Sequence, residues 1–221
     1  MMHKLCHVVI SLMSLCAVSN AFAEDMPPAF EGRRLFVSHC QICHGRSGEG
    51  DGPLAKQMGI TPANLNVTVR ARSDTILKKI IRGDGRPTIT GRDRHDLLST
   101  AMPKWKDVFG DAEIDALIAY LRFLSSSKHE LMGDPAVGRT LYLKYCGVCH
   151  GEEGSGDGIM TGLMDIEPMD HTNPNATSPL SNEQLLSSIL DGKGEFMPAW
   201  RGVLSQNDVE ALVSYIRLLA Y

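Results

Sequence analysis

Hydrophobic positions recur every three or four residues in several separate segments of the chain. One such stripe spans residues 76–81 and ends at Gly83, and longer stripes span residues 114–124 and 209–219. This spacing places the apolar side chains on one face of an α-helix. No segment alternates apolar and polar residues convincingly, as a half-buried strand does. The pattern therefore predicts an all-α chain.

Capping residues and loops separate these helices. Asp134 followed by Pro135 is typical of a helix start, and Ser205 with Asp208 places an acid in the first turn of another helix. Loops rich in Gly, Pro and Asn lie between the helices, for example at residues 45–52. The chain thus reads as short helices joined by loops.

The same series of signals occurs twice, which indicates an internal repeat. Residues 32–36 match residues 138–142 at an offset of 106, and the glycine-rich loops that follow also match. Residues 102–105 match residues 197–200, each with the string Met-Pro-x-Trp, at an offset of 95. The first half therefore carries extra residues between Gly85 and Met102. With the short polar linker 125–128, the repeat predicts two domains, at 24–128 and 129–221.

The first 23 residues have the features of a secretory signal peptide. Lys4 supplies the positive charge, residues 5–18 are mostly apolar, and Ala21-Phe22-Ala23 provides a small-x-small cleavage site. A membrane anchor is the alternative, but the apolar stretch is too short to span a bilayer comfortably. We expect cleavage after Ala23 and a periplasmic mature protein.

Cleavage would leave four cysteines, all in two C-x-x-C-H strings at residues 40–44 and 146–150. This string is the attachment site of c-type haem. Two thiols one helical turn apart can react with the two haem vinyl groups, and the histidine that follows is then held against the iron. The sequence predicts two covalent haem c groups, attached through Cys40, Cys43, Cys146 and Cys149, with His44 and His150 as iron ligands.

Three other interpretations of the cysteines remain. A zinc site would need pairs much closer than the 106 residues that separate Cys40 from Cys146. A thioredoxin-like motif needs no histidine at that position and would accompany a βαβ pattern. Two local disulfides are possible outside the cytosol.

The C-x-x-C-H-G strings, the G-x-G-D-G loops and the Met-Pro-x-Trp strings resemble the class I cytochrome c family over nearly all of residues 29–221. The double arrangement resembles bacterial dihaem cytochromes such as cytochrome c4, while the loops are more similar to small cytochrome modules attached to oxidases and dehydrogenases. The resemblance implies two tandem class I domains, each a few helices wrapped around one covalent haem. It also implies that the first and last helices cross at a small residue beside an aromatic pair. The matching positions are Gly32, Phe36 and Tyr120, and Gly138, Tyr142 and Tyr215.

The resemblance further implies that the carbonyls of Pro62 and Pro168 accept the second N–H of the iron-ligating histidines. An ordinary turn proline is the alternative at both positions. Trp105 and Trp200 would pack at the haem edge, or belong simply to the core.

The sixth iron ligand decides between electron transfer and chemistry on a substrate. Met102 and Met197 are the candidates, because each precedes proline at the same place in the two repeats. Proline disfavours helix at the methionine and leaves it extended on a loop. Three histidines could compete for the role, but we expect them to be exposed or capping residues: His39, His95 and His171.

Charge differs between the halves. Residues 24–132 contain 16 basic and 14 acidic side chains, whereas residues 133–221 contain 5 basic and 12 acidic ones. A basic and an acidic half could dock two different redox proteins, because complementary fields speed encounter. A merely solvated surface is the alternative.

Together these features predict an electron carrier rather than an enzyme. It would take single electrons from a dehydrogenase or quinol-oxidising complex and pass them to a terminal oxidase or reductase. We expect redox proteins as partners, with membrane-bound redox complexes as one option, and no nucleic acid. Two alternatives are a dihaem peroxidase with one open iron and a haem subunit held in a larger redox enzyme.

Overall fold

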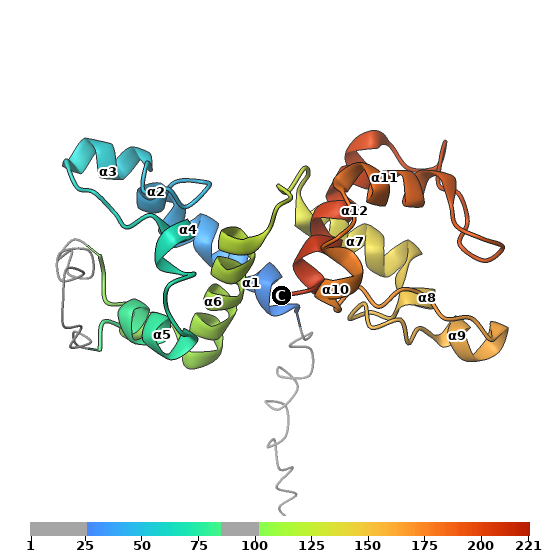
Figure 1. The fold of residues 1–221 in the computed structure, drawn as a ribbon, viewed down its shortest axis with the longest axis horizontal. Helices are drawn as coiled ribbons and strands as arrows, with labels where there is room; N and C mark the ends of the chain where they lie inside the picture. Colours follow the sequence, from blue (N-terminus) through green and yellow to red (C-terminus); the bar gives the residue numbers. More distant parts are fainter. Residues whose placement is uncertain (1–25, 85–101) are drawn as a thin grey trace, which may run out of the picture.

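The computed structural model describes residues 26–84 and 102–221. Over these ranges the chain folds as two helical units, one for each half of the sequence repeat (Figure 1). Strand-type pairing in the described ranges is limited to two isolated bridges, Lys193 with Met197 and Arg201 with Leu204. The all-α prediction is therefore confirmed. Among the helices of these ranges, none combines the length and the apolar character needed to cross a membrane.

The α-helices of the two units follow one another in the same order, and the first unit also has two short turns, η1 and η3. The first has α1 (Pro28–Leu35), the π-helical turn η1 (Phe36–Cys40), α2 (Gln41–His44), α3 (Pro53–Met58), α4 (Leu65–Thr68), α5 (Asp74–Arg82), the 3-10 turn η3 (Trp105–Asp107) and α6 (Asp111–Ser126). The second has α7 (Pro135–Tyr145), α8 (Gly147–His150), α9 (Ile159–Met164), α10 (Pro174–Thr177), α11 (Asn182–Asp191) and α12 (Gln206–Leu219).

Local signals explain where the longer helices begin and end. The Asp134 carboxylate accepts the Ala136 N–H at 3.0 Å at the start of α7. Ser205 and Asp208 form a reciprocal capping box at the start of α12. Gly83 ends α5 with a φ of 77°, a left-handed conformation that glycine adopts without strain. These helix starts and this stop agree with the sequence predictions.

The first and last helices of each unit cross at a glycine. A Cβ atom on Gly32 of α1 would overlap the Ala116 carbonyl oxygen of α6. In the same way, a Cβ atom on Gly138 of α7 would overlap the Ala211 carbonyl oxygen of α12. An aromatic pair packs beside each crossing with ring centroids 5.3 Å apart: Phe36 with Tyr120, and Tyr142 with Tyr215. The structure therefore contains both crossings that the resemblance implied.

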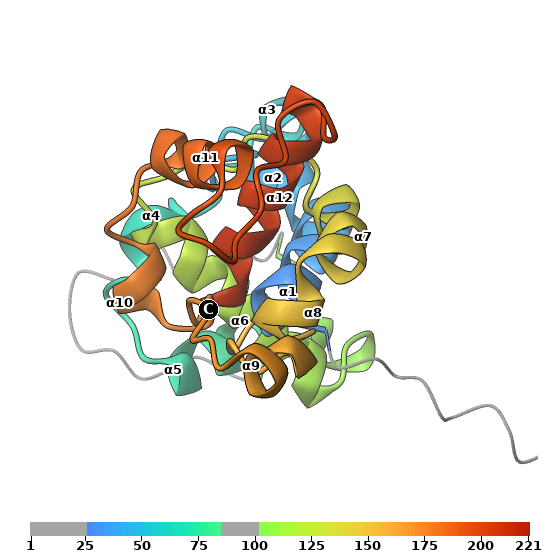
Figure 2. The ribbon, with the colours of Figure 1, turned by 90° about the vertical axis from the view of Figure 1, so that its right-hand side faces the viewer.

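Each unit has its own core, and the two units meet along a seam between α1 and α12. Helix α1 contacts α6 of its own unit and also α12 of the second unit (Figures 1 and 2). Phe30 packs against both cores and meets Tyr215 edge to face at 5.7 Å. Phe123 meets Tyr221 in the same way at 5.3 Å. The Ser214 hydroxyl accepts two backbone N–H groups of the joining segment. Aromatic packing and these hydrogen bonds join the units.

Candidate haem-binding sites

A cavity of about 270 Å³ lies in the first unit. Cys40, Cys43 and His44 line it from η1 and α2, and Met102 lines it from the segment before η3. Most other lining side chains are apolar and include Leu54, Met58, Leu77, Ile81, Leu117 and Leu121. The structure thus brings together the four side chains that the sequence assigns to the first haem.

The second unit has an equivalent cavity of about 630 Å³. Cys149 and His150 line it from α8, Cys146 lines it from the residue between α7 and α8, and Met197 lines it from the loop between α11 and α12. Its apolar wall includes Tyr145, Ile166, Leu185, Ile189, Trp200 and Ile216. The four residues assigned to the second haem therefore also share one cavity.

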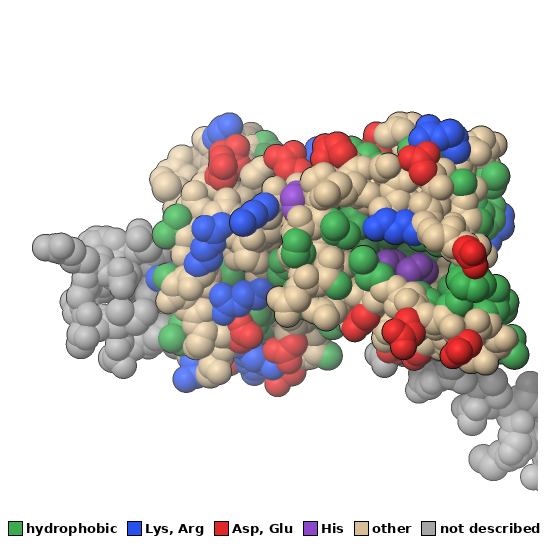
Figure 3. All heavy atoms as spheres, turned by 45° about the vertical axis from the view of Figure 1, so that its right-hand side comes forward, with side chains coloured by type: hydrophobic (Ala, Val, Ile, Leu, Met, Phe, Trp, Pro, Cys, Tyr) green, Lys and Arg blue, Asp and Glu red, His purple; other side chains and the backbone are tan. Residues whose placement is uncertain are grey.

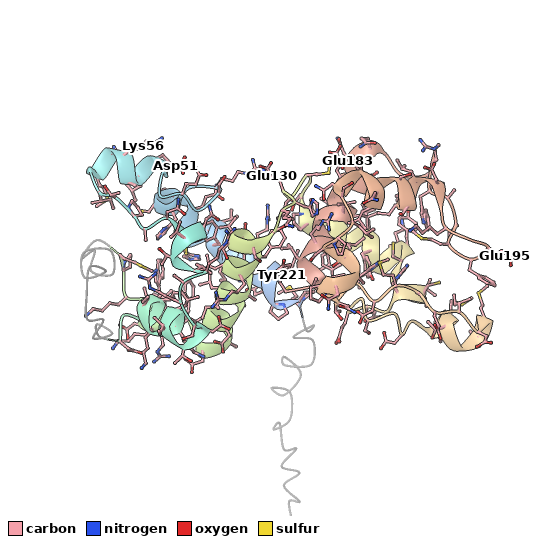
Figure 4. The ribbon with its side chains drawn as sticks, in the orientation of Figure 1. Asp51, Lys56, Glu130, Glu183, Glu195 and Tyr221 are labelled. Atoms are coloured by element: carbon pink, nitrogen blue, oxygen red, sulfur yellow. The ribbon has the colours of Figure 1, made fainter. Side chains whose placement is uncertain are left out.

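The two cavities face opposite ends of the molecule. Glu195, which lines the second cavity, lies at the outer end of the second unit (Figure 4). Lys56 lies at the other end of the molecule on α3, a helix whose Leu54 and Met58 line the first cavity (Figure 4). Helices that meet near the seam form the inner walls, through α6 in the first unit and α12 in the second. Packed helices therefore separate the two sites.

One helical turn places the two cysteines and the histidine of each string together. Cys40, Cys43 and His44 stand at positions i, i+3 and i+4, which project from the same face of a helix. The turn ends at Gly45, whose φ is 78° and whose N–H donates to the Gln41 carbonyl at 2.8 Å. The second string repeats this geometry. The spacing predicted from sequence therefore has its structural basis in α2 and α8.

The histidines bond to carbonyls other than those predicted. His44 Nδ1 lies 3.3 Å from the Ala63 carbonyl oxygen, and His150 Nδ1 lies 3.0 Å from that of Met169. The prediction that Pro62 and Pro168 accept these bonds is wrong by one residue in both units. The proline carbonyls instead face Gly50 and Gly156 so closely that a Cβ atom there would lie 2.5 and 2.8 Å away. In both sites the Nδ1–H can donate to a carbonyl, which leaves Nε2 free to bind a metal.

Burial sets the charge state of these groups. Desolvation lowers the pKa of His44 and of His150, so both rings are neutral at pH 7. Desolvation also raises the pKa of the Cys40 and Cys146 thiols to about 12. Such a wall disfavours the thiolates of a zinc site and suits a neutral thioether beside a neutral imidazole ligand. Haem c therefore fits the donor set, and none of the four cysteines forms a disulfide.

Local packing holds the two methionine strings. Met197 exchanges both backbone hydrogen bonds with Lys193, and the Trp200 N–H donates to the Ile189 carbonyl at 3.2 Å. The loop that carries Met197 is thus tied to the end of α11. Trp200 packs on Tyr145 with centroids 5.0 Å apart, and Trp105 stacks on Phe109 at 5.1 Å. Both tryptophans line their cavities while packing on core aromatic rings.

The three histidines that could compete with the methionines as iron ligands lie in different surroundings. His39 is half-buried, bonds the Leu35 carbonyl through Nδ1 at 3.1 Å and packs edge-on against Trp105 and Phe109. His95 lies outside the described residues. His171 is only 7% exposed and lies between helices, so the expectation of an exposed or capping residue is wrong there.

His171 is in contact with His150, the histidine of the second C-x-x-C-H string. Its ring is stacked on His150 with centroids 4.3 Å apart and planes 15° apart. Its Nδ1 lies 3.0 Å from the buried Tyr142 hydroxyl oxygen. Burial, followed by the neighbouring His150, lowers the pKa of His171 to about 3, so the ring is neutral at pH 7. Sequence reasoning missed this pair, although Leu65 and Phe36 at the equivalent repeat positions mark it as a difference between the halves.

Comparison with known proteins agrees with this geometry. Residues 29–125 match the family described as cytochrome c, and residues 133–216 match the family described as cytochrome c oxidase, cbb3-type, subunit III. A reducing HAO-like protein complex from Kuenenia stuttgartiensis is 23% identical to this chain and covers 86% of it, with 96% of that chain matched. Its TM-score of 0.36 is too low to support an argument.

Two curated relatives are similar over most of the chain. Cbb3-type cytochrome c oxidase subunit FixP of Bradyrhizobium diazoefficiens is 28% identical over 94% of this chain and 68% of its own length. Subunit CcoP of an Azospirillum species is 25% identical over 85% of this chain and 61% of its own length. The chain thus spans about two thirds or less of the length of these relatives. The chain consists of two cytochrome c domains in tandem, one in each half.

Proposed function

We propose that this protein is a periplasmic electron carrier that holds two covalent haem c groups and transfers single electrons between redox proteins. The observation that carries the proposal is the repetition of one cavity. In each unit a C-x-x-C-H turn and a Met-Pro-x-Trp methionine line the same apolar space. A bound haem c supplies an iron that alternates between the ferric and ferrous states.

The residues divide the work of holding this group. The cysteines would form thioethers, and the Nε2 atoms of His44 and His150 would bind the iron while their Nδ1 atoms are bonded to carbonyls. Met102 and Met197 would supply the other protein ligand of each iron. Two protein ligands leave no position for a substrate, which favours electron transfer over chemistry at the iron. The apolar walls keep water from the site.

A fixed haem subunit of a larger redox enzyme is the second candidate. The names of the relatives favour it, because they are subunits of cbb3-type oxidases. Purification from native membranes and from the soluble fraction distinguishes the two. A free carrier is recovered as a small soluble dihaem protein, whereas a fixed subunit co-purifies with an oxidase at constant stoichiometry.

A dihaem peroxidase is disfavoured by the methionine in each cavity. Such an enzyme needs one iron with an open or exchangeable position. A visible spectrum separates the alternatives: two low-spin haems with a methionine–iron charge-transfer band support the carrier, and a high-spin haem that reacts with peroxide supports the enzyme.

Covalent stoichiometry tests the central claim. Acid–acetone extraction should leave two haems on each mature chain, because thioether bonds resist it. Replacing both Cys146 and Cys149 by serine should leave the second unit poorly folded and reduce the retained haem to about one per chain, while replacing both Cys40 and Cys43 should do the same for the first unit. Complete release of haem from the unmodified protein by the extraction would overturn the proposal.

A further inference from the structure

The second cavity contains a buried histidine–tyrosine pair. Tyr142 is fully buried and His171 is 7% exposed, and the hydroxyl oxygen and Nδ1 lie 3.0 Å apart. The ring of His171 also stacks on the ring of His150, with the two ring centroids 4.3 Å apart. Figure 3 shows histidine side chains inside a hollow bordered by apolar side chains. The axial histidine is thus backed by a second ring that a tyrosine holds.

The first unit has the same backbone at this place but different side chains. The Leu65 N–H donates to the Gly48 carbonyl at 2.7 Å, and the His171 N–H donates to the Gly154 carbonyl at the same distance. Leu65 stands two residues after Ala63, whose carbonyl oxygen contacts His44. His171 likewise stands two residues after Met169, whose carbonyl oxygen contacts His150. Leu65 packs against the first core, to which Phe36 belongs. Leucine with phenylalanine therefore suffices to build this part of the fold.

The polar pair carries an energetic cost that the apolar pair does not. Burying a hydroxyl and an imidazole is unfavourable unless they bond to one another, and a bonded pair roughly offsets its own desolvation. Packing alone therefore gives no reason for the exchange of Leu65 and Phe36 for His171 and Tyr142. The place of the pair, in contact with an axial ligand, gives a functional reason.

The stacking also decides which role His171 can take. Two axial ligands of one iron lie on opposite faces of the haem, with the haem plane between them. The rings of His171 and His150 are in face-to-face contact. His171 is therefore a neighbour of the axial ligand rather than a competitor of Met197.

We propose that His171, held by Tyr142, is a positioning residue that fixes the ring plane of His150 and lowers the reduction potential of the second haem. A flat stack restricts rotation of the axial ring about its Cβ–Cγ bond. A polar group beside the ligand stabilises the more positive ferric state relative to a leucine side chain. The inference rests on the proposed function, because it requires His150 to bind iron. It makes the two haems unequal by a device absent from the first unit.

His171→Leu tests this directly, because it installs the residue of the first unit. We expect a redox titration to show a higher potential for the second haem and an unchanged potential for the first. The electron paramagnetic resonance spectrum of the ferric protein should show altered g-values for one low-spin haem only, because these report the axial ring plane. Both haems should remain covalently bound, so failure of this test is distinct from failure of the proposed function, which absence of haem would reveal.

Two further variants separate positioning from packing. His171→Phe keeps a flat ring, so the g-values should be retained while the potential rises. Tyr142→Phe keeps the stack and removes only the hydroxyl, so the potential should rise by less than in His171→Leu. The reciprocal pair Leu65→His with Phe36→Tyr should lower the potential of the first haem.

Two results would overturn the proposal. One is a His171→Leu protein with two haems whose potentials and g-values are those of the unmodified protein. The other is an equal shift of both potentials, which would indicate a general change in the fold. If His171→Leu fails to retain the second haem, Tyr142→Phe decides instead, and an unchanged second potential in that variant rejects the proposal.

Discussion

Met102 and Met197 line the same cavities as His44 and His150. A thioether donates less to ferric iron than an imidazole does, so methionine raises a haem's potential. Met197→His should therefore lower the potential of the second haem and keep it low-spin. Spectroelectrochemical titration measures both properties. An unmoved potential would show that Met197 is not the ligand.

The first haem allows the complementary experiment. Met102→Ala should convert the first haem to the high-spin state, because alanine offers no ligand. His95→Ala serves as its control, since His95 stands seven residues earlier in the segment outside the described residues. Visible spectra distinguish the outcomes. High spin in the His95 variant, with Met102→Ala unchanged, would transfer the role of ligand to His95.

At the level of single residues, sequence patterns located the chemically obvious groups and failed on their neighbours. C-x-x-C-H and Met-Pro-x-Trp are local strings, so the residues that line the cavities could be named in advance. The acceptor carbonyls of Ala63 and Met169 could not, because a one-residue shift in a loop leaves no mark on the pattern. His171 was misjudged for a related reason. Burial of a polar residue depends on a distant partner, here Tyr142.

The helix crossings can be tested at the scale of elements. Gly32→Ala would push a methyl group into the Ala116 carbonyl and within 2.9 Å of the Tyr120 Cβ. We expect a loss of about 1–3 kcal/mol in the free energy of unfolding, or more if the helices cannot separate. Gly162→Ala in α9 is the matched control, because nothing lies within 4 Å of its Cβ position. Urea unfolding should show little change, or a gain of up to about 1 kcal/mol from helix propensity.

Each unit also has an arginine on its last helix that bonds to the segment leading into α5 in the first unit and into α11 in the second. Arg217 of α12 donates to the carbonyls of Thr177 and Leu180 and to the Asn182 side chain. Arg122 of α6 donates in the same pattern to the carbonyls of Val69 and Arg72 and to the Asp74 carboxylate. The two arginines differ in burial: Arg217 is 4% exposed, whereas the Arg122 side chain is 31% exposed.

This difference predicts unequal costs of removal. Arg217→Met should cost about 2–3 kcal/mol, because buried carbonyls lose their partners. Arg122→Met should cost about 1 kcal/mol, because water can replace the lost bonds. Chemical unfolding followed by the absorbance of each haem measures both. If both variants lost the same free energy of unfolding, burial of the arginine would not explain the cost.

The longer helices were predictable because their apolar stripes and caps are local. The four-residue helices α4 and α10 were not, since so few residues carry no periodicity. The arginine ties were also missed. An arginine on an amphipathic helix looks like part of the solvated face until the loop that it holds is placed beside it.

For the whole molecule, charge asymmetry predicts two docking faces. The second unit is strongly acidic, and the segment that precedes Met102 carries Arg92 and Arg94, which lie outside the described residues. Charge reversal at both arginines should slow electron transfer with one partner, an acidic one, and leave a basic partner unaffected. Stopped-flow rates at low and high salt measure this, because salt screens exposed charges. Unchanged rates with both partners at low salt would leave the asymmetry without a role.

The placement of the cavities at opposite ends agrees with this division (Figure 4). Two partners could bind at once without touching one another. An electron entering at one end would then have to pass through the packed helices of the seam to reach the other. We expect this internal step to be the part of the transfer that neither partner's charge affects.

The seam also has a consequence for how the protein is made. It joins α1 to α12, which is synthesised much later than α1, so the seam cannot form until α12 has emerged. Most of each core comes from its own unit, although Leu218 of α12 completes the first one, so each unit can close around its cavity before that point. A molecule whose second unit failed to mature would leave Phe30 without its partners on α12 and expose apolar surface to proteases. The same contacts that join the finished halves would thus mark an unfinished chain for degradation.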